Sequence, residues 1–219
     1  MARPAKKAPE EWREAILKAA KTLFLTKGYR ETSVADVMKL AGGAKGLFYS
    51  FFGSKEELVC VLSERLFLAS NPFLAVRGRE DLTGLEKIRE VLRVDRGDRE
   101  RDKLSREVVP ILRDPAILAA AVEANRRILT PLWRELLEEG RRDGSIRTPY
   151  TRELSELLPL LDFWFLPSVF PATAEEIRRK YRFAAEALTK MGLPILEEEA
   201  GAFAEEVIAD IAAGEEDRP

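Results

Sequence analysis

The chain has 219 residues, of which 46% are hydrophobic and 34% are charged, and this balance is typical of a globular protein with a packed core. It contains one cysteine, Cys60, and no histidine, which excludes an intramolecular disulfide and removes the most common metal ligand and proton shuttle. The net charge of −2 is unevenly spread, because residues 1–55 contain eleven basic and five acidic residues and therefore carry +6 against −8 for the remainder. A positive segment of this kind suits a polyanionic partner.

The first predicted helix covers residues 10–27. Apolar side chains recur in it at helical spacing, among them Trp12, Ile16 and Leu23. Gly28 follows directly, and glycine is the usual residue just beyond the end of a helix. The pattern therefore predicts one helix ahead of the next motif.

Residues 33–52 predict a helix-turn-helix. Ser33 and Asp36 have the spacing of a capping box at the start of a short helix. The two glycines at 42–43 permit the positive φ that a sharp corner needs, and a second short helix is expected over residues 44–52. One side of that helix, with Phe48, can pack while the other faces a groove.

A fourth helix is expected from Ser54 to about Ser70, because Ser54 and Glu57 repeat the capping pattern. The first three helices then form one unit, and the fourth leads out of it. We expect an N-terminal domain over residues 10–70.

The remainder of the chain predicts only further helices, and hence an all-α fold with a second, larger domain over residues 71–214. These helices are expected from Thr83, over about 104–112 with a bend at Pro110, from Pro115 to about Gly140, over about 154–165, over about 177–192 and over about 195–213. The densest apolar run, residues 157–170, is too short for a bilayer and contains Asp162, so we expect no membrane span and a cytoplasmic location.

Two groups in the second domain have open interpretations. Trp133, Phe163 and Trp164, with Asn125 to orient a ligand, are candidates for an apolar effector pocket, although ordinary core packing explains them equally well. The small residues of the last two helices fit either a dimer interface or packing within one copy. These residues are Ala184, Ala185, Ala200, Gly201 and Ala204.

The sequence argues against an enzyme. The glycine-rich stretch at residues 42–46 matches neither the P-loop nor the dinucleotide-binding pattern, and no predicted strand precedes it. No nucleophile has a histidine base, and no Cys/His cluster offers a metal site. We therefore expect no catalytic residues, no metal and no cofactor.

Residues 16–58 resemble the tetracycline-repressor (TetR) family of bacterial transcription regulators. The matching features, in order, are AILKAAKTLFLTKGYRETSVADVMKLAG, then KGLFY, then SKEEL. The resemblance implies an N-terminal three-helix helix-turn-helix domain that binds DNA and a C-terminal helical domain for effector binding and dimerisation. It also implies a homodimer that sets two third helices into successive major grooves of a palindromic operator in double-stranded DNA.

The resemblance also implies roles for individual residues. Ser33, Tyr49 and Lys55 correspond to phosphate contacts. The groove-facing positions are Lys45, Gly46, Leu47, Ser50 and Phe51. Only Lys45 and Ser50 among these can hydrogen-bond a base edge, whereas Leu47 suits a thymine methyl group.

The resulting hypothesis is a ligand-controlled repressor, released from its operator by an apolar small molecule. An architectural DNA-binding protein without ligand control is the first alternative, and a helical enzyme is the second.

Overall fold

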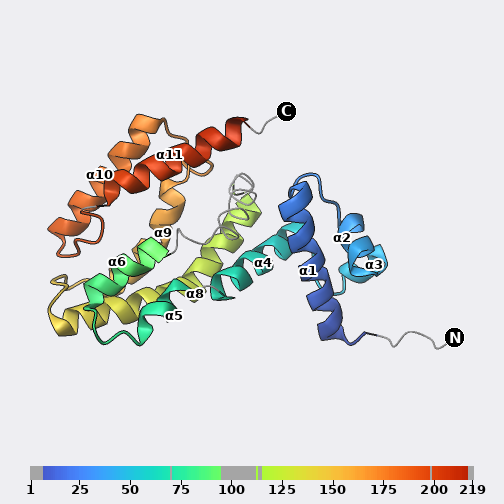
Figure 1. Ribbon diagram of the computed structural model, residues 1–219, viewed down its shortest axis with the longest axis horizontal. Coiled ribbons are helices and arrows are strands. Elements are labelled where there is room, and N and C mark those ends of the chain that lie inside the picture. The colour runs from blue at the N-terminus through green and yellow to red at the C-terminus, as the bar shows by residue number, and fades with distance from the viewer. Residues whose placement is uncertain (1–6, 70, 95–111, 113–114, 198, 217–219) are drawn as a thin grey trace. The chain divides into compact units, whose positions relative to one another are not determined.

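A computed structural model describes residues 7–69, 71–94, 112, 115–197 and 199–216. Every regular element in these residues is a helix, which confirms the predicted all-α fold (Figure 1). The helices are α1 (Pro9–Lys27), α2 (Val34–Ala41), α3 (Lys45–Phe48), α4 (Lys55–Ala69), α5 (Pro72–Arg77), α6 (Gly84–Val94), α8 (Pro115–Asp143), α9 (Thr151–Phe165), α10 (Ala174–Lys190) and α11 (Ala200–Glu216).

The chain divides into two compact units. Of the described residues, unit 1 contains 7–69 and unit 2 contains the rest. None of the described helices is both long enough and apolar enough to cross a bilayer. The helix expected over about 104–112 lies outside the described residues, except for Leu112.

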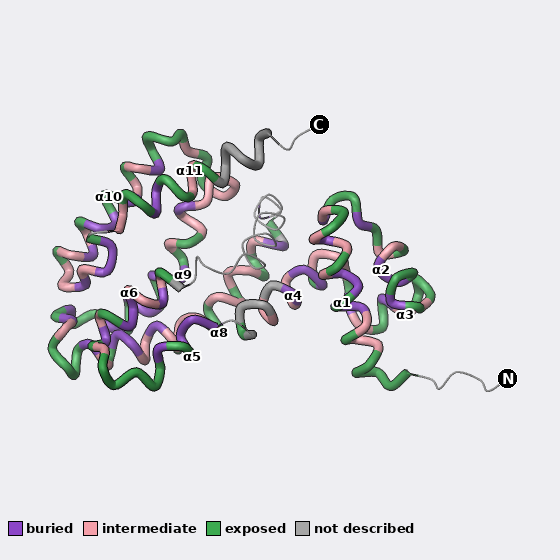
Figure 2. Tube along the Cα trace, viewed as in Figure 1, coloured by how far each residue is buried: buried purple, intermediate pink, exposed green. Residues whose placement is uncertain are grey.

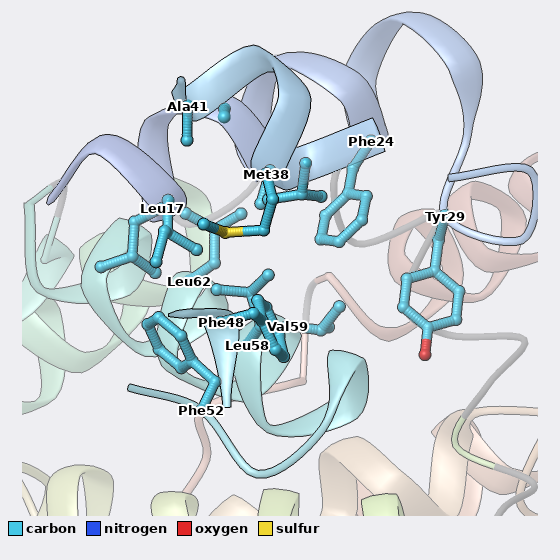
Figure 3. Packing of buried hydrophobic residues seen from close by; sticks show 14 residues of the cluster. Leu17, Phe24, Tyr29, Met38, Ala41, Phe48, Phe52, Leu58, Val59 and Leu62 are labelled. Atoms are coloured by element: carbon cyan, nitrogen blue, oxygen red, sulfur yellow. The ribbon is translucent and has the colours of Figure 1, made fainter. Parts of the chain in front are cut away.

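Unit 1 is held together by one cluster of fourteen buried residues contributed by α1 to α4 and the segments between them (Figure 3). Phe48 and Phe52 are 0% and 1% exposed, so they fix the short α3 to the rest of the unit. A helix of four residues has no stability of its own in water, because too few hydrogen bonds offset the ordering of the chain. The buried aromatic rings are therefore what holds α3 in place.

The two glycines at the corner between α2 and α3 serve different purposes. Gly42 has φ 82° and ends α2 in the left-handed conformation, as expected. Of the two glycines that permit a positive φ, only Gly42 adopts one. A Cβ at Gly43 would lie 2.7 Å from the Met38 Cε and 2.8 Å from a Trp12 ring carbon, so this glycine is required for close packing.

Two predicted boundaries are wrong, and one helix was missed. The helix expected over 44–52 is α helical only over Lys45–Phe48, after which Ser50 and Phe51 continue with tighter three-residue hydrogen bonds. The last helix begins at Ala200 and not at 195, because Ile195 and Leu196 are buried in a turn. The short α5 was not expected, although Asn71 caps it and Pro72 opens it.

In unit 2, α8 packs against α6 and α9, and α10 packs against α11. The α6 and α8 backbones approach closely, since a Cβ on Gly84 would lie 2.2 Å from the Gly140 backbone nitrogen. Both α6 and α8 carry buried residues, among them Ile88 on α6 and Leu137 on α8 (Figure 2). Lys87, with a side chain only 4% exposed, pairs with Glu139 beside this contact.

Candidate nucleic-acid interface

The exposed side of α3 and of the turn after it presents the groups that the sequence singled out. Lys45, Gly46 and Ser50 are exposed, and Tyr49 is 56% exposed. The opposite side carries Phe48 and is buried in the core. Side chains on a surface of this kind can reach a partner without disturbing the packing beneath them.

Leu47 and Phe51 lie differently from the other groove-facing candidates. Both are partly buried and pack against the core cluster of unit 1. They can offer only an apolar edge to a partner. Lys45 and Ser50 are therefore the exposed hydrogen-bonding groups among the five groove-facing candidates.

Ser33 caps α2, and its polar atoms are occupied locally. Its Oγ accepts a hydrogen bond from the Asp36 backbone N–H at 3.1 Å and donates one to Asp36 Oδ2 at 2.8 Å. The same Oδ2 accepts hydrogen bonds from Ser33 N and from Lys27 Nζ, both at 2.9 Å. These donors, Lys27 first and Ser33 next, hold the pKa of Asp36 well below its usual range. To donate to a phosphate, the Ser33 hydroxyl would have to release this carboxylate.

Tyr49 lies at the C-terminal end of α3 with its ring edge-on to Phe48, at a centroid distance of 5.4 Å. Because Phe48 is fully buried, this contact supports the Tyr49 ring from below while most of the side chain stays accessible. A phenol held in this way can donate its O–H to a phosphate oxygen.

Lys55 begins α4 and is half-buried. Its Nζ donates hydrogen bonds to the backbone carbonyls of Tyr29 and Thr32, each at 2.9 Å, and lies 4.0 Å from the centre of the Tyr29 ring. Burial lowers the pKa of Lys55, while the neighbouring Glu56 and Glu31 raise it. The ammonium group is thus directed toward the loop between α1 and α2.

A further basic contact at the helix-turn-helix corner was missed by the sequence reasoning. Lys7 Nζ donates to the Ala41 carbonyl at 3.1 Å and lies 4.4 Å from the centre of the Trp12 ring. The contact ties the segment before α1 to the end of α2. No local pattern predicts it, because the bonded atoms are 34 residues apart in the sequence.

The four candidates for an effector pocket fall into different groups in unit 2. Trp133 is 7% exposed and packs edge-on against Phe73. Trp164 contacts Phe165 and Phe183, and none of the ring contacts in the described residues joins it to Trp133 or Phe163. Asn125 donates to the Pro159 carbonyl at 3.2 Å, which is the behaviour of a satisfied core amide.

Unit 2 contains a hollow that lies apart from the four effector-pocket candidates. It has a volume of about 250 Å³ and is lined by Leu82, Glu86, Arg89, Glu90, Arg93, Ile195 and Glu199. Its arginines are engaged, since Arg93 pairs with Glu90 and Glu199, and Arg89 donates to the Pro194 carbonyl. None of the four effector-pocket candidates lines it.

The described part of the chain contains no group of three or more His, Cys, Asp or Glu residues placed to hold a metal ion. Cys60 on α4 is half-buried, and burial, together with the acidic residues around it, raises the pKa of its thiol. A thiol with a raised pKa is a poor nucleophile.

A family model described as "Bacterial regulatory proteins, tetR family" matches residues 16–60, which all lie in unit 1. Among curated proteins, the HTH-type transcriptional regulator TtgR of Pseudomonas putida is 38% identical over 66 residues, which are 30% of this chain and 31% of TtgR. This match therefore spans about a third of the length of that relative.

Among solved structures, the likeness extends further along the chain. The Thermus thermophilus FadR, described as a TetR family transcriptional repressor in complex with lauroyl-CoA, is 25% identical with a TM-score of 0.59. The match covers 78% of this chain and 92% of that one. RolR in complex with resorcinol has a TM-score of 0.58 and 21% identity, with 90% and 93% covered, and supports the fold alone.

Proposed function

We propose that this chain, which belongs to the TetR family of bacterial regulatory proteins, is a DNA-binding transcriptional regulator of the bacterial cytoplasm. It binds a palindromic operator as a homodimer, represses, and is released by a small-molecule effector. The unit that binds DNA is residues 10–70, with its helix-turn-helix at 33–52, and the unit for the effector and the dimer contact is residues 71–214.

The observation that carries this proposal is the two-sided α3. Phe48 and Phe52 anchor it in the core, while Lys45, Tyr49 and Ser50 stand exposed on its outer side and on the turn that follows. A rigidly held helix with exposed hydrogen-bonding groups suits the major groove, where each base pair presents its own pattern of donors and acceptors.

Within the site, the proposed contacts divide by type. Lys45 and Ser50 read base edges, and Leu47 and Phe51 offer apolar contact, including contact to thymine methyl groups. A Cβ at Gly46 would meet nothing within 4 Å in the free protein, so packing does not require glycine there, and the missing side chain lets the backbone approach DNA closely. Tyr49 and Ser33 contact phosphates and set the register, with Ser33 first giving up its bond to Asp36.

The test is selection of bound sequences from random DNA with the full-length chain, followed by titration of the enriched site at several salt concentrations. We expect an inverted repeat whose half-sites lie about 34–36 Å apart or at a multiple of that spacing. Salt-dependent binding without any enriched sequence would favour an architectural protein. Absence of DNA binding would refute the proposal.

The effector site is proposed in unit 2, because the Thermus thermophilus FadR matches this chain over most of its length and its complex holds lauroyl-CoA. Among the four candidates, Phe163 and Trp164 are the half-buried aromatic side chains, so they offer surface that an apolar ligand can cover. Trp133 and Asn125 already have partners inside the unit and would line the site from behind.

Thermal shift against a library of apolar small molecules and acyl thioesters tests the effector proposal. A compound that raises the melting temperature and weakens operator binding supports it, and Trp164→Ala should reduce that shift without changing operator affinity in the absence of the compound. If no compound has either effect, the architectural alternative is favoured.

A further inference from the structure

The beginning of α4 is joined to the loop between α1 and α2 by three polar contacts. Lys55 Nζ donates to the carbonyls of Tyr29 and Thr32 at 2.9 Å each, and the Tyr29 hydroxyl donates to Glu56 Oε1 at 2.7 Å. The atoms joined are 23 to 27 residues apart in the sequence, so these contacts fix tertiary structure. We call these four residues the clasp.

The two loop residues of the clasp, Tyr29 and Thr32, are buried and held by further contacts. Tyr29 is 5% exposed and packs edge-on against Phe24 at the margin of the core cluster (Figure 3). Thr32 is 1% exposed, and its hydroxyl donates to the Gly28 carbonyl at 2.7 Å. The loop directly follows the C-terminus of α1, where the helix dipole favours a cation. Both carbonyls are thus fixed acceptors suited to an ammonium group.

The same geometry leaves the Lys55 ammonium group little capacity to donate a hydrogen bond to a phosphate. The Lys55 ammonium has three hydrogens, of which two are donated to carbonyls, and its remaining side faces the Tyr29 ring. The first turn of α4 also carries Glu56 and Glu57. Glu57 is engaged in capping, since its N–H donates to Ser54 Oγ and its carboxylate accepts from Gly53 N. Like-charge repulsion from these carboxylates opposes the attraction that a helix N-terminus exerts on a phosphate.

We propose that Lys55 is a positioning residue: its ammonium holds the loop before α2 against α4 and so sets the helix-turn-helix for DNA, without being a phosphate ligand itself. This proposal rests on the proposed function and refines the role that family resemblance implies for Lys55. The loop leads directly into Ser33 and α2, so an error in its placement is passed to α2 and to α3 beyond it.

Salt dependence separates the two roles. Each lost phosphate contact reduces the slope of log affinity against log salt by about 0.9, whereas misplacement of a surface weakens binding without removing a particular counterion. The experiment compares operator binding by the parent chain, Lys55→Met and Lys45→Met over a range of salt, at temperatures well below each melting transition. Lys45 is the control, because its ammonium is exposed on α3, and a cation placed in the groove neutralises nearby phosphates and releases counterions even when it hydrogen-bonds a base edge.

We expect Lys55→Met to lose about tenfold or more in operator affinity with the parent slope retained, since charge-assisted hydrogen bonds of ordinary strength are worth that factor. Lys45→Met should lower both the affinity and the slope. A slope reduced equally in both variants would make Lys55 a phosphate ligand and overturn the proposal. A lower melting temperature with parental affinity would make its role purely structural, which also overturns it.

A second pair of variants keeps the test valid if Lys55→Met does not fold. Glu56→Gln removes the charge and keeps an oxygen that accepts from the Tyr29 hydroxyl, while Glu56→Ala removes both. We expect Glu56→Gln to bind the operator about twofold to fivefold more tightly than Glu56→Ala, with equal slopes. Equal affinities would count against the clasp. If the parent chain itself binds no DNA, the proposed function fails and the role of Lys55 fails with it, whereas defects confined to the variants leave that function standing.

Discussion

Unit 1 and unit 2 bring their helices together by different means. In unit 1, large side chains from α1, α2, α3 and α4 fill a single cluster, and the four-residue α3 depends on them entirely. In unit 2, the backbones of α6 and α8 meet at Gly84 and Gly140, and beside them the buried Lys87 pairs with the partly exposed Glu139. The difference shows that a small unit can display a short helix rigidly when its anchors are aromatic, since such rings bury much apolar surface per residue.

The two units also differ in what their relatives share. The family model matches residues 16–60, inside unit 1, whereas the structural likeness to Thermus thermophilus FadR covers 78% of the chain. The structural likeness therefore extends beyond the residues that the family model matches and into unit 2.

The largest effect is expected where the aromatic anchoring is broken. Phe48→Ala should lower the free energy of unfolding of unit 1 by about 3–5 kcal/mol, because Phe48 is fully buried and a cavity would remain. Operator binding should be lost with it, as measured by chemical denaturation and DNA titration. Phe183→Ala in unit 2 is the control and should be near neutral, since Phe183 is 65% exposed. Comparable losses in both variants would show that burial does not distinguish the two rings.

The backbone contact of unit 2 supplies the next largest effect. Gly84→Ala should cost about 3 kcal/mol, at the upper end of overpacking penalties, because its Cβ would lie 2.2 Å from a backbone atom that cannot turn away. Denaturation followed by tryptophan fluorescence should show unit 2 unfolding earlier while operator affinity at low temperature is unchanged. Gly201→Ala, where nothing lies within 4 Å of the added Cβ, should be neutral or stabilising by up to about 1 kcal/mol. A Gly84→Ala chain as stable as its parent would contradict the close approach of α6 and α8.

Phe48 and Gly84 also show which features of the fold the sequence could predict and which it could not. The capping box of Ser33 and Asp36, the core side of α3 with Phe48, and the end of α1 at Gly28 were all expected from local patterns. The contact of Gly84 with Gly140 was not, because two glycines 56 residues apart carry no side-chain signal of their pairing.

The errors do not all have this origin. Ile195 and Leu196 look like a helix start, but they are apolar because they are buried in a turn, and apolar spacing alone does not separate the two cases. The missed α5 did have a local signal, since Asn71 followed by Pro72 is a typical helix opening. The lysine contacts of Lys7 and Lys55 had none, because a lysine bonded to a distant carbonyl reads in sequence as a surface charge.

A smaller effect, on DNA binding and not on stability, is expected from substitutions on the exposed side of α3. Lys45→Ala should lose about 1–3 kcal/mol of discrimination at the base pair that Lys45 contacts, while affinity for random DNA falls much less. Repeating the selection from random DNA with this variant should relax one position in each half-site. The free energy of unfolding should be unchanged, because Lys45 is exposed. If Lys45→Ala selects the parental operator unaltered, the groove assignment of α3 is wrong.

The smallest effect compares one carboxylate from each unit as pH falls. The pKa of Asp36 is held well below its usual 3.8 by Lys27 and Ser33, and that of Asp81 is lowered to about 2 by Arg79. A carboxyl whose folded pKa is depressed adds stability above the unfolded pKa, and this contribution disappears as pH falls below 3.8 toward the folded value. The side chains of Asp36 and Asp81 are 38% and 62% exposed, so solvent screens both ion pairs and we expect small changes that salt weakens further.

Asn replacement isolates each carboxylate, because Asn keeps an acceptor oxygen and cannot ionise. Asp36→Asn should be less stable than the parent at pH 7, with the gap closing below pH 3.8 and the loss confined to unit 1. Asp81→Asn should show the same closing gap in unit 2. Denaturant titrations at pH 7, 5, 3.5, 2.5 and about 1.5 measure both gaps, because the Asp81 contribution is lost only as pH falls through about 2, and carboxyl NMR shifts report the two pKa values directly. Since Asp36 accepts from two residues and Asp81 from Arg79, the Asp36 gap should still be closing at a pH where that of Asp81 has gone. A gap at Asp36 that is constant from pH 7 to 2.5 would show that its bonds to Lys27 and Ser33 do not form in solution.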